Sequence, residues 1–169
     1  MALLTILEYP DARLKRIASP VTEFSPAVKK LVDDMAETMY AAPGIGLAAT
    51  QVDVHKQIVV IDISSDKSDL RVFVNPQITA ASGEVLGEEG CLSVPEYYDK
   101  VRRAAQITVT AQDASGKPFT LEADGMLAVC IQHEMDHLKG KLFVEHLSSL
   151  KQMRVRTKMI KRHREEARA

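Results

Sequence analysis

The segment His133-Glu134-Met135-Asp136-His137 constrains this chain more than any other part of its sequence. An α-helix advances about 1.5 Å and about 100° per residue, so histidines four positions apart lie on one face, roughly 6 Å apart. Both imidazoles can then bind one metal ion, while Glu134 is rotated off that line and can reach a water molecule on the metal. The pattern is typical of metal-assisted hydrolysis, and two histidines in polar contacts on a buried helix are the competing interpretation.

Two histidines do not complete a metal site, and four other residues could supply a third ligand. Cys130 lies on the helix itself, two turns or about 10 Å from the second histidine, and ligands in one row cannot form a tetrahedron. Glu145 and His146 could fold back, but LFVEHL is simpler to interpret as an apolar segment with polar residues facing outward. We favour Cys91, in an expected glycine-bearing loop, GEEGCLSVPEYY. A thiolate and two imidazoles bind Zn²⁺ or Fe²⁺ well and leave a fourth position for water.

Turn residues and hydrophobic spacing divide the chain into helices and strands. Ser25 as N-cap and Pro26 at the first helical position predict a helix that ends before Pro43. A loop is expected to begin at Gly44. The predicted strands are residues 57–64, 71–78, 105–112 and 117–123, of which the last two form a hairpin.

The histidine helix should run from about Gly125 to Lys139 and be closed by Gly140. Ser148 or Ser149 could cap a last helix. Its expected buried side carries Leu150, Met153, Thr157 and Ile160. Helices that alternate irregularly with hairpin-like strands favour an α+β fold. We therefore expect a compact single domain at 1–169, with antiparallel or mixed strands around a central metal-binding helix and a basic C-terminal helix at 148–169.

Charge is unevenly distributed along the 169 residues, whose net charge is −1. Residues 148–169 include eight Lys or Arg and two Glu, a net charge of +6, so the preceding residues carry −7. Such a tail indicates a polyanionic partner, or a solvated helix with basic residues near its carboxyl end. We expect no membrane partner, because no run approaches the ~18 apolar residues of a membrane span. Without an export signal, Cys91 and Cys130 should be free thiols in the cytoplasm.

Three motifs together resemble the signatures of the bacterial peptide deformylases. They are GIGLAATQ at 44–51, EGCLS at 89–93 and QHEMDHL at 132–138, in the family's order and separation. The resemblance extends over almost the whole chain and implies the compact α+β deformylase fold. It also implies one divalent metal ion held by Cys91, His133 and His137. The family favours Fe²⁺, with Zn²⁺ or other divalent metals as alternatives.

The same resemblance implies hydrolysis of the N-formyl group from the N-formylmethionine of nascent polypeptides, with release of formate. Metal-bound water would attack the formyl carbon, with Glu134 as general base and then acid. The resemblance assigns the Gln51 amide and the Leu92 backbone N–H to the developing oxyanion, and places Arg103 near the metal centre. It assigns to the substrate site Ile45, Gly46, Gly90, Leu127, Val129 and Cys130.

The basic segment 148–169 resembles the helix that docks on the ribosome beside the exit tunnel in similar bacterial deformylases, and no sequence-specific nucleic acid binding is expected. Two other functions compete with deformylation. A zinc endopeptidase would need a third His or Glu ligand downstream and a long cleft. A metal-storing module would need a fourth protein ligand and would leave Glu134 and Gln51 without a role.

Overall fold

The computed structural model describes residues 2–168 and contains three α-helices, three short 3₁₀ turns and seven strands. The helices are α1 (Pro26–Ala41), α2 (Gly125–Leu138) and α3 (Ser149–Arg168), and the 3₁₀ turns are η1 (Ala12–Lys15), η2 (Ala49–Val52) and η3 (Phe143–His146). The strands are β1 (Gly46–Ala48), β2 (Ile58–Ile61), β3 (Arg71–Ser82), β4 (Val85–Cys91), β5 (Val94–Arg103), β6 (Gln106–Gln112) and β7 (Pro118–Asp124).

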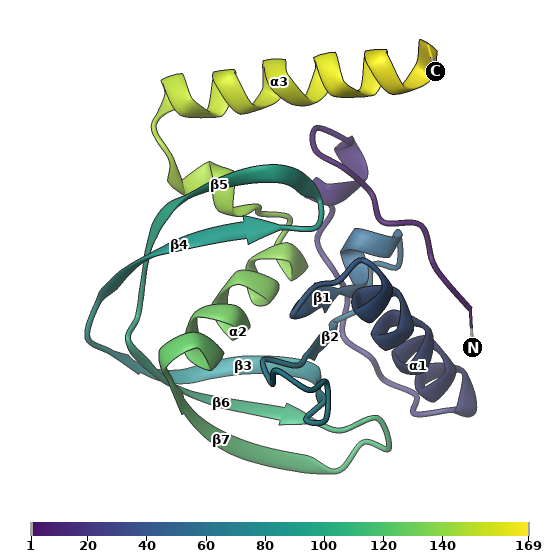
Figure 1. The fold of residues 1–169 in the computed structure, drawn as a ribbon. Helices are drawn as coiled ribbons and strands as arrows, with labels where there is room; N and C mark the ends of the chain where they lie inside the picture. The colour runs from purple at the N-terminus through teal and green to yellow at the C-terminus, as the bar shows by residue number, and fades with distance from the viewer. Residues whose placement is uncertain (1, 169) are drawn as a thin grey trace.

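These strands form two antiparallel sheets on either side of α2, as Figure 1 shows. The larger sheet has the order β1-β2-β3-β6-β7, and the smaller one is the β4–β5 hairpin. The predicted hairpin of 105–112 with 117–123 is β6 and β7, paired from Gln106 with Asp124 to Gln112 with Pro118. The expected α+β class, with antiparallel strands around a central helix and a further helix at the C-terminus, is confirmed.

Helix α2 has one face for the core and another for the functional site. Its residues Ala128, Ile131, Met135 and Leu138 are buried against side chains of the larger sheet. They recur at the three- and four-residue spacing of a helix face, so burying this face orients the whole helix. The histidine face turns toward the β4–β5 hairpin, where Cys91 contacts His137. The predicted boundaries hold, because α2 ends at Leu138 and Gly140 follows with φ +77°.

Helix α1 begins at Pro26 with Ser25 as its N-cap residue, as predicted. Its buried face packs against β1 and β2. The predicted loop after Gly44 is wrong in part, because residues 46–48 form β1 and pair with β2 in the register Gly46 to Ile61. Three residues are too few to produce a recognisable alternation of polar and apolar side chains.

The predicted loop around Cys91 is also wrong, because Cys91 is the last residue of strand β4. Most side chains of β4 are exposed or half-buried, so the strand lacks the alternating pattern that marks a half-buried sheet. The register shifts between Gly90 and Cys91 as the hairpin turns into β5. Such irregularities re-aim a side chain, and here the side chain is the predicted metal ligand.

Helix α3 lies across the top of the molecule in Figure 1, alongside β5. It is anchored by Val155 and Met159, which are buried in a cluster that also includes Leu142, Phe143 and Val144 of the η3 region. The predicted buried side is therefore wrong. Its residues Leu150, Met153, Thr157 and Ile160 are exposed, Met153 to 67%.

One ion pair and one histidine–carboxylate contact fix the far end of α3 to the rest of the molecule. Arg162 Nη1 lies 2.8 Å from Glu96 Oε2, and His163 Nε2 lies 2.9 Å from Glu8 Oε1. Ala169, the last residue of the predicted basic segment, lies outside the described residues. Within residues 2–168, no helix is long and apolar enough to cross a membrane.

Candidate metal centre and active site

Cys91, His133 and His137 converge from two separate elements. Cys91 Sγ lies 3.3 Å from His137 Nε2, and one ligand atom of each residue lies within 4.8 Å of the others. Ligand atoms around a tetrahedral ion with Zn–S near 2.3 Å and Zn–N near 2.05 Å are separated by ~3.3–3.6 Å. The three donors therefore fit a single divalent ion with a fourth position left for water.

The other candidates for the third ligand lie elsewhere. Glu145 Oε2 accepts a hydrogen bond from the Leu142 N–H at 2.7 Å, and His146 Nε2 contacts Asp136 at 2.9 Å. Cys130 is buried beside Gly46, and burial raises the pKa of its thiol well above the usual value. A protonated thiol is a poor ligand, so the geometry and the chemistry both favour Cys91.

A buried ionic network holds His133. The ring Nδ1 donates to Glu89 Oε1 at 2.9 Å, which leaves Nε2 for a metal. Arg103 donates two hydrogen bonds to the same carboxylate, from Nε at 2.8 Å and from Nη2 at 2.9 Å. Burial alone would raise the pKa of Glu89, but the hydrogen bonds from Arg103 and His133 lower it to about 2. The predicted position of Arg103 near the metal centre thus has a physical basis in its contact with Glu89.

His137 is fully buried, and burial together with the charges of His133 and Arg103 holds its pKa well below the usual value. A neutral imidazole is the form that binds a metal. Its Nδ1 has no hydrogen-bond partner among the described residues. His133 stacks on Phe143, with ring centroids 5.9 Å apart, which restricts rotation of the first imidazole.

Glu134 lies beside these ligands, on the same helix but not among the three. Burial raises the pKa of its carboxyl to about 7. Oε1 has no hydrogen-bond partner within residues 2–168. The backbone of Gly46 in β1 packs against the other oxygen, Oε2. A Cβ at this position would lie only 2.5 Å from it. The carboxylate therefore has one oxygen confined by backbone and one able to accept a proton.

Gln51 lies beside the Cys91 sulfur, and Leu92 follows Cys91 in the chain. The Gln51 Oε1 accepts a hydrogen bond from the Ala48 N–H at 2.9 Å, which fixes the direction of the amide. Its Nε2 then donates to Ser93 Oγ at 3.0 Å and lies 3.6 Å from Cys91 Sγ. The amide nitrogen has two N–H donors, and one of them donates to the Cys91 sulfur, so this donor lies beside the three clustered ligands.

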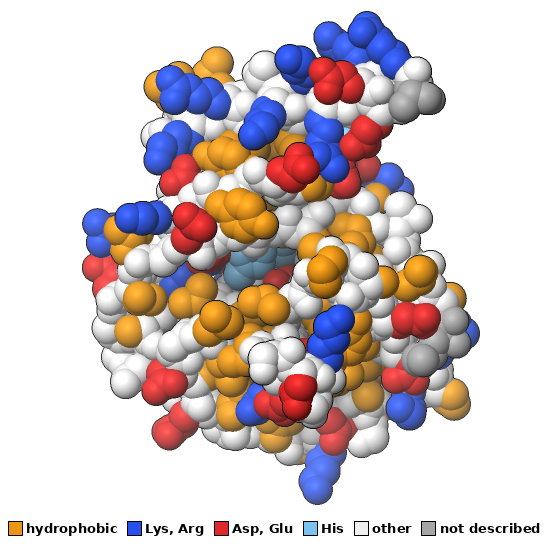
Figure 2. Space-filling model, viewed as in Figure 1, with side chains coloured by type: hydrophobic (Ala, Val, Ile, Leu, Met, Phe, Trp, Pro, Cys, Tyr) orange, Lys and Arg blue, Asp and Glu red, His pale blue; other side chains and the backbone are white. Residues whose placement is uncertain are grey.

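A cavity of about 830 Å³ opens next to this cluster. Figure 2 shows it as a hollow with histidine at its floor and apolar side chains around it. Of the predicted substrate residues, the cavity is lined by Ile45, Gly46, Gly90, Val129 and Cys130. The structure does not bring Leu127 to it; that side chain packs against the main core, and Met126 lines the cavity instead.

Comparison with known proteins agrees with this geometry. The sequence profile described as polypeptide deformylase matches residues 3–153. The peptide deformylase of Chromobacterium violaceum is 59% identical over 165 residues, which cover 98% of this chain and 99% of the relative. The chain belongs to the polypeptide deformylase family. A solved peptide deformylase from Legionella pneumophila is 50% identical and superposes with a TM-score of 0.94, over 99% of each chain.

As a member of this family the protein is a metallo-hydrolase, and its Cys/His/His cluster is consistent with one divalent metal ion. Sequence reasoning included Glu89 and Ser93 in the motif EGCLS without assigning either a role, and it did not single out Met126. Helical spacing could have found Met126, because positions 126, 130 and 133 share a face of α2. The roles of Glu89 and Ser93 had no such signal, since their contacts with His133 and Gln51 are made between distant segments.

Proposed function

We propose that this protein removes the formyl group from the N-formylmethionine of nascent polypeptides and releases formate. The observation that carries the proposal is the Cys91–His133–His137 cluster beside the buried Glu134, at the floor of an apolar cavity. Membership of the deformylase family supports the choice of substrate. When bound, a divalent ion lowers the pKa of a water molecule and polarises a carbonyl oxygen.

Glu134 is proposed to take the proton from the attacking water and to pass it to the leaving nitrogen as the C–N bond breaks. A carboxyl whose pKa is raised to about 7 can both accept and return a proton near neutral pH. The unpartnered Oε1 supports this role, because nothing described in the structure competes for it.

The Gln51 amide and the Leu92 backbone N–H are proposed to stabilise the negative oxygen that forms on the formyl carbon. The fixed amide of Gln51, 3.6 Å from Cys91 Sγ, supports its part in this pairing. Preorganised donors cost no reorganisation during the reaction, and one such donor is worth ~3–4 kcal/mol of barrier.

Ile45, Val129, Cys130 and Met126 are proposed to receive the methionine side chain. An apolar wall that includes a flexible thioether suits a substrate with the same group. Gly46 and Gly90 would let the peptide backbone approach the site. The assignment of Leu127 stays a prediction, and its contact with the core favours a supporting role behind the wall.

Fe²⁺ is proposed as the native metal, with Zn²⁺ or other divalent ions able to replace it, since thiolate and imidazole donors suit both. Protein purified without oxygen should contain about one metal ion per chain and release formate from a formyl-Met-Ala peptide. The matched acetyl-Met-Ala peptide should release nothing. Exposure to air should abolish the activity of the Fe²⁺ form but not that of the Zn²⁺ form. Failure to release formate with any divalent metal would contradict the function, and cleavage of internal peptide bonds would favour an endopeptidase.

Helix α3 is proposed to dock on the ribosome, which would also place the protein in the cytoplasm. Its exposed side combines apolar and basic side chains, with Leu150 58% and Met153 67% exposed. Lys161 and Arg164 are exposed on the same side. A surface of ribosomal RNA is polyanionic, so basic side chains around an apolar stripe fit it.

Reversing two charges, as Lys161→Glu with Arg164→Glu, should weaken co-sedimentation with ribosomes by about tenfold or more and reduce its salt dependence. A matched control is Lys29→Glu with Lys117→Glu, which makes the same change in net charge on other exposed positions. Point variants are preferable to removal of α3, because removal would uncover the cluster around Val155 and Met159. If the two double variants co-sediment with ribosomes equally well, the proposed docking of α3 is contradicted.

A further inference from the structure

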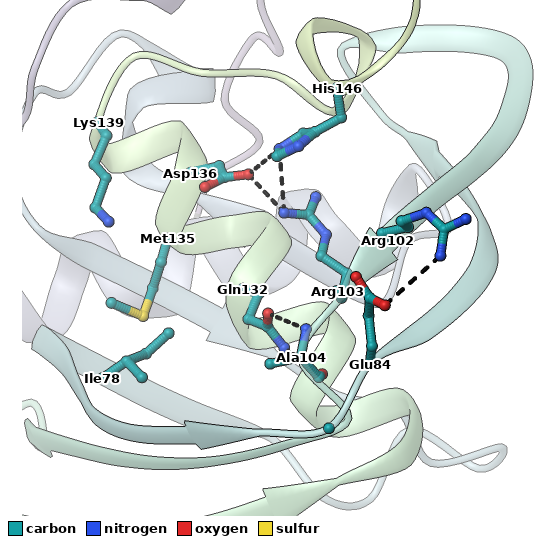
Figure 3. Close-up of a pocket in the computed structure, with 11 residues that line it drawn as sticks. Ile78, Glu84, Arg102, Arg103, Ala104, Gln132, Met135, Asp136, Lys139 and His146 are labelled. Carbon is teal, nitrogen blue, oxygen red and sulfur yellow. Dashed lines mark hydrogen bonds and ion pairs between the residues drawn. The ribbon is translucent and has the colours of Figure 1, made fainter.

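A second cavity, of about 410 Å³, lies behind the metal centre, at the junction of β5, α2 and η3 (Figure 3). Its wall includes Arg102, Arg103, Gln132, Asp136, Lys139 and His146. Gln132 ties α2 to the end of β5, since its side-chain amide both donates to and accepts from the Ala104 backbone at 2.9 and 3.0 Å. These two hydrogen bonds fix α2 relative to the end of β5 in this part of the wall.

A chain of contacts leads from this wall to the metal ligand His133. His146 Nε2 lies 2.9 Å from Asp136 Oδ2 and 3.4 Å from Arg103 Nη1, and the same carboxylate oxygen accepts from Arg103 Nη1 at 2.7 Å. Figure 3 shows these three side chains pointing toward one another. Beyond them, the two remaining nitrogens of the guanidinium, Nε and Nη2, donate to Glu89, which also accepts the His133 Nδ1–H.

We propose that Asp136 and His146 are positioning residues for the metal ligand His133. They act through Arg103 and Glu89, and this role rests on the metal-dependent function proposed above. They lie in the wall of the second cavity and do not touch the metal ligands' donor atoms.

Burial of the Arg103 guanidinium explains why Asp136 and His146 affect His133. The Arg103 side chain is only 4% exposed, so each unpaired N–H would cost the desolvation of a charged donor. Glu89 satisfies Nε and Nη2, and Asp136 satisfies Nη1. Without Asp136, the neighbour left to Nη1 is His146 Nε2, 3.4 Å away. A turn of the planar guanidinium toward it moves both bonds to Glu89 at once. Glu89 sets the ring orientation of His133, so the disturbance reaches the metal.

His146 is the most exposed residue in this chain of contacts, and it restricts the position of Asp136. Its side chain is 38% exposed, whereas that of Asp136 is 17% exposed, so His146 partly covers the carboxylate from solvent. The imidazole contacts both Asp136 Oδ2 and Arg103 Nη1, so it holds the carboxylate in the rotamer that faces Arg103. The effect of His146 should therefore have the same direction as that of Asp136 and a smaller size.

The test measures metal dissociation constants without substrate, together with the visible absorption spectrum of the Co²⁺ form. Groups that orient a metal ligand typically change affinity by ~10–100-fold, so Asp136→Asn should raise the dissociation constant by about tenfold or more and change the Co²⁺ spectrum. His146→Gln should change both in the same direction by less. Asp136→Glu should recover part of the affinity.

Arg102→Gln and Lys139→Gln are the matched controls, because both residues line the same cavity but lie outside the chain of contacts. Neither control should alter affinity or spectrum. Unchanged affinity and spectrum in folded Asp136→Asn would overturn the proposal, and if that variant does not fold, the same result in His146→Gln would overturn it. Because no substrate is present, failure of this proposal is distinguishable from failure of the proposed deformylation.

Discussion

Replacing Glu134 with glutamine should lower kcat by roughly 10²–10⁴-fold, the range expected for loss of a general acid–base. Glutamine keeps the size of the side chain and its fit against Gly46, where a Cβ would lie 2.5 Å from Oε2. It cannot accept the proton through Oε1 and return it to the leaving nitrogen. Because Glu134 is not among the three clustered donors, metal content should stay at the wild-type level.

The measurement is formate release per mole of bound metal. Glu122→Gln supplies the matched control, since it makes the same chemical change on an exposed position of β7. KM should change little, because the carboxylate is proposed to act on the reacting atoms and not on the methionine side chain. Near-normal turnover by a metal-loaded Glu134→Gln variant would show that another group carries the proton.

Replacing Cys91 with alanine should weaken metal binding by more than ~100-fold, because groups that merely orient a ligand already change affinity by ~10–100-fold. The variant keeps His133 and His137 on one helix turn but loses the donor that approaches from β4. Two donors in a row do not define a tetrahedral site. The loss should appear in equilibrium dialysis and as loss of the sulfur-to-metal absorption of the Co²⁺ form.

Cys130→Ala is the control that the chain itself offers, because it removes the other thiol from the same neighbourhood. Cys130 lies beside Gly46 and Glu134, and its thiol is held protonated by burial. Its removal should leave metal affinity and the Co²⁺ spectrum unchanged. Unaltered metal binding by Cys91→Ala would mean that the third ligand lies elsewhere.

The elements that could be predicted are those whose hydrophobic spacing and terminal residues indicate which face is buried and where the element ends. Helix α2 shows its buried face at helical spacing and its end at Gly140, and the β6–β7 hairpin shows alternation and a turn. Strand β4 could not be predicted, because most of its residues are exposed or half-buried, its one buried side chain is the charged Glu89, and its composition is that of a loop. Its existence depends on pairing with β5, which is a property of the folded chain.

Helix α3 illustrates a different limit. It carries two stripes of apolar residues, one with Val155 and Met159 and the other with Leu150, Met153 and Ile160. Spacing alone identifies both stripes but does not tell which one faces the protein. The choice is made by the cluster of Leu142, Phe143 and Val144, which the preceding turn places beneath the helix.

The two ends of the chain meet at the mouth of the active-site cavity. Glu8 and Arg162 both line it, and the contact between Glu8 and His163 joins residues 155 positions apart. Contacts of such separation form late, because the intervening chain must first be made and ordered. All three clustered donors have been synthesised once His137 has been added. The three donors therefore precede in the chain the α3 residues that border the cavity, and the contact between Glu8 and His163 becomes possible only after all three donors have been made.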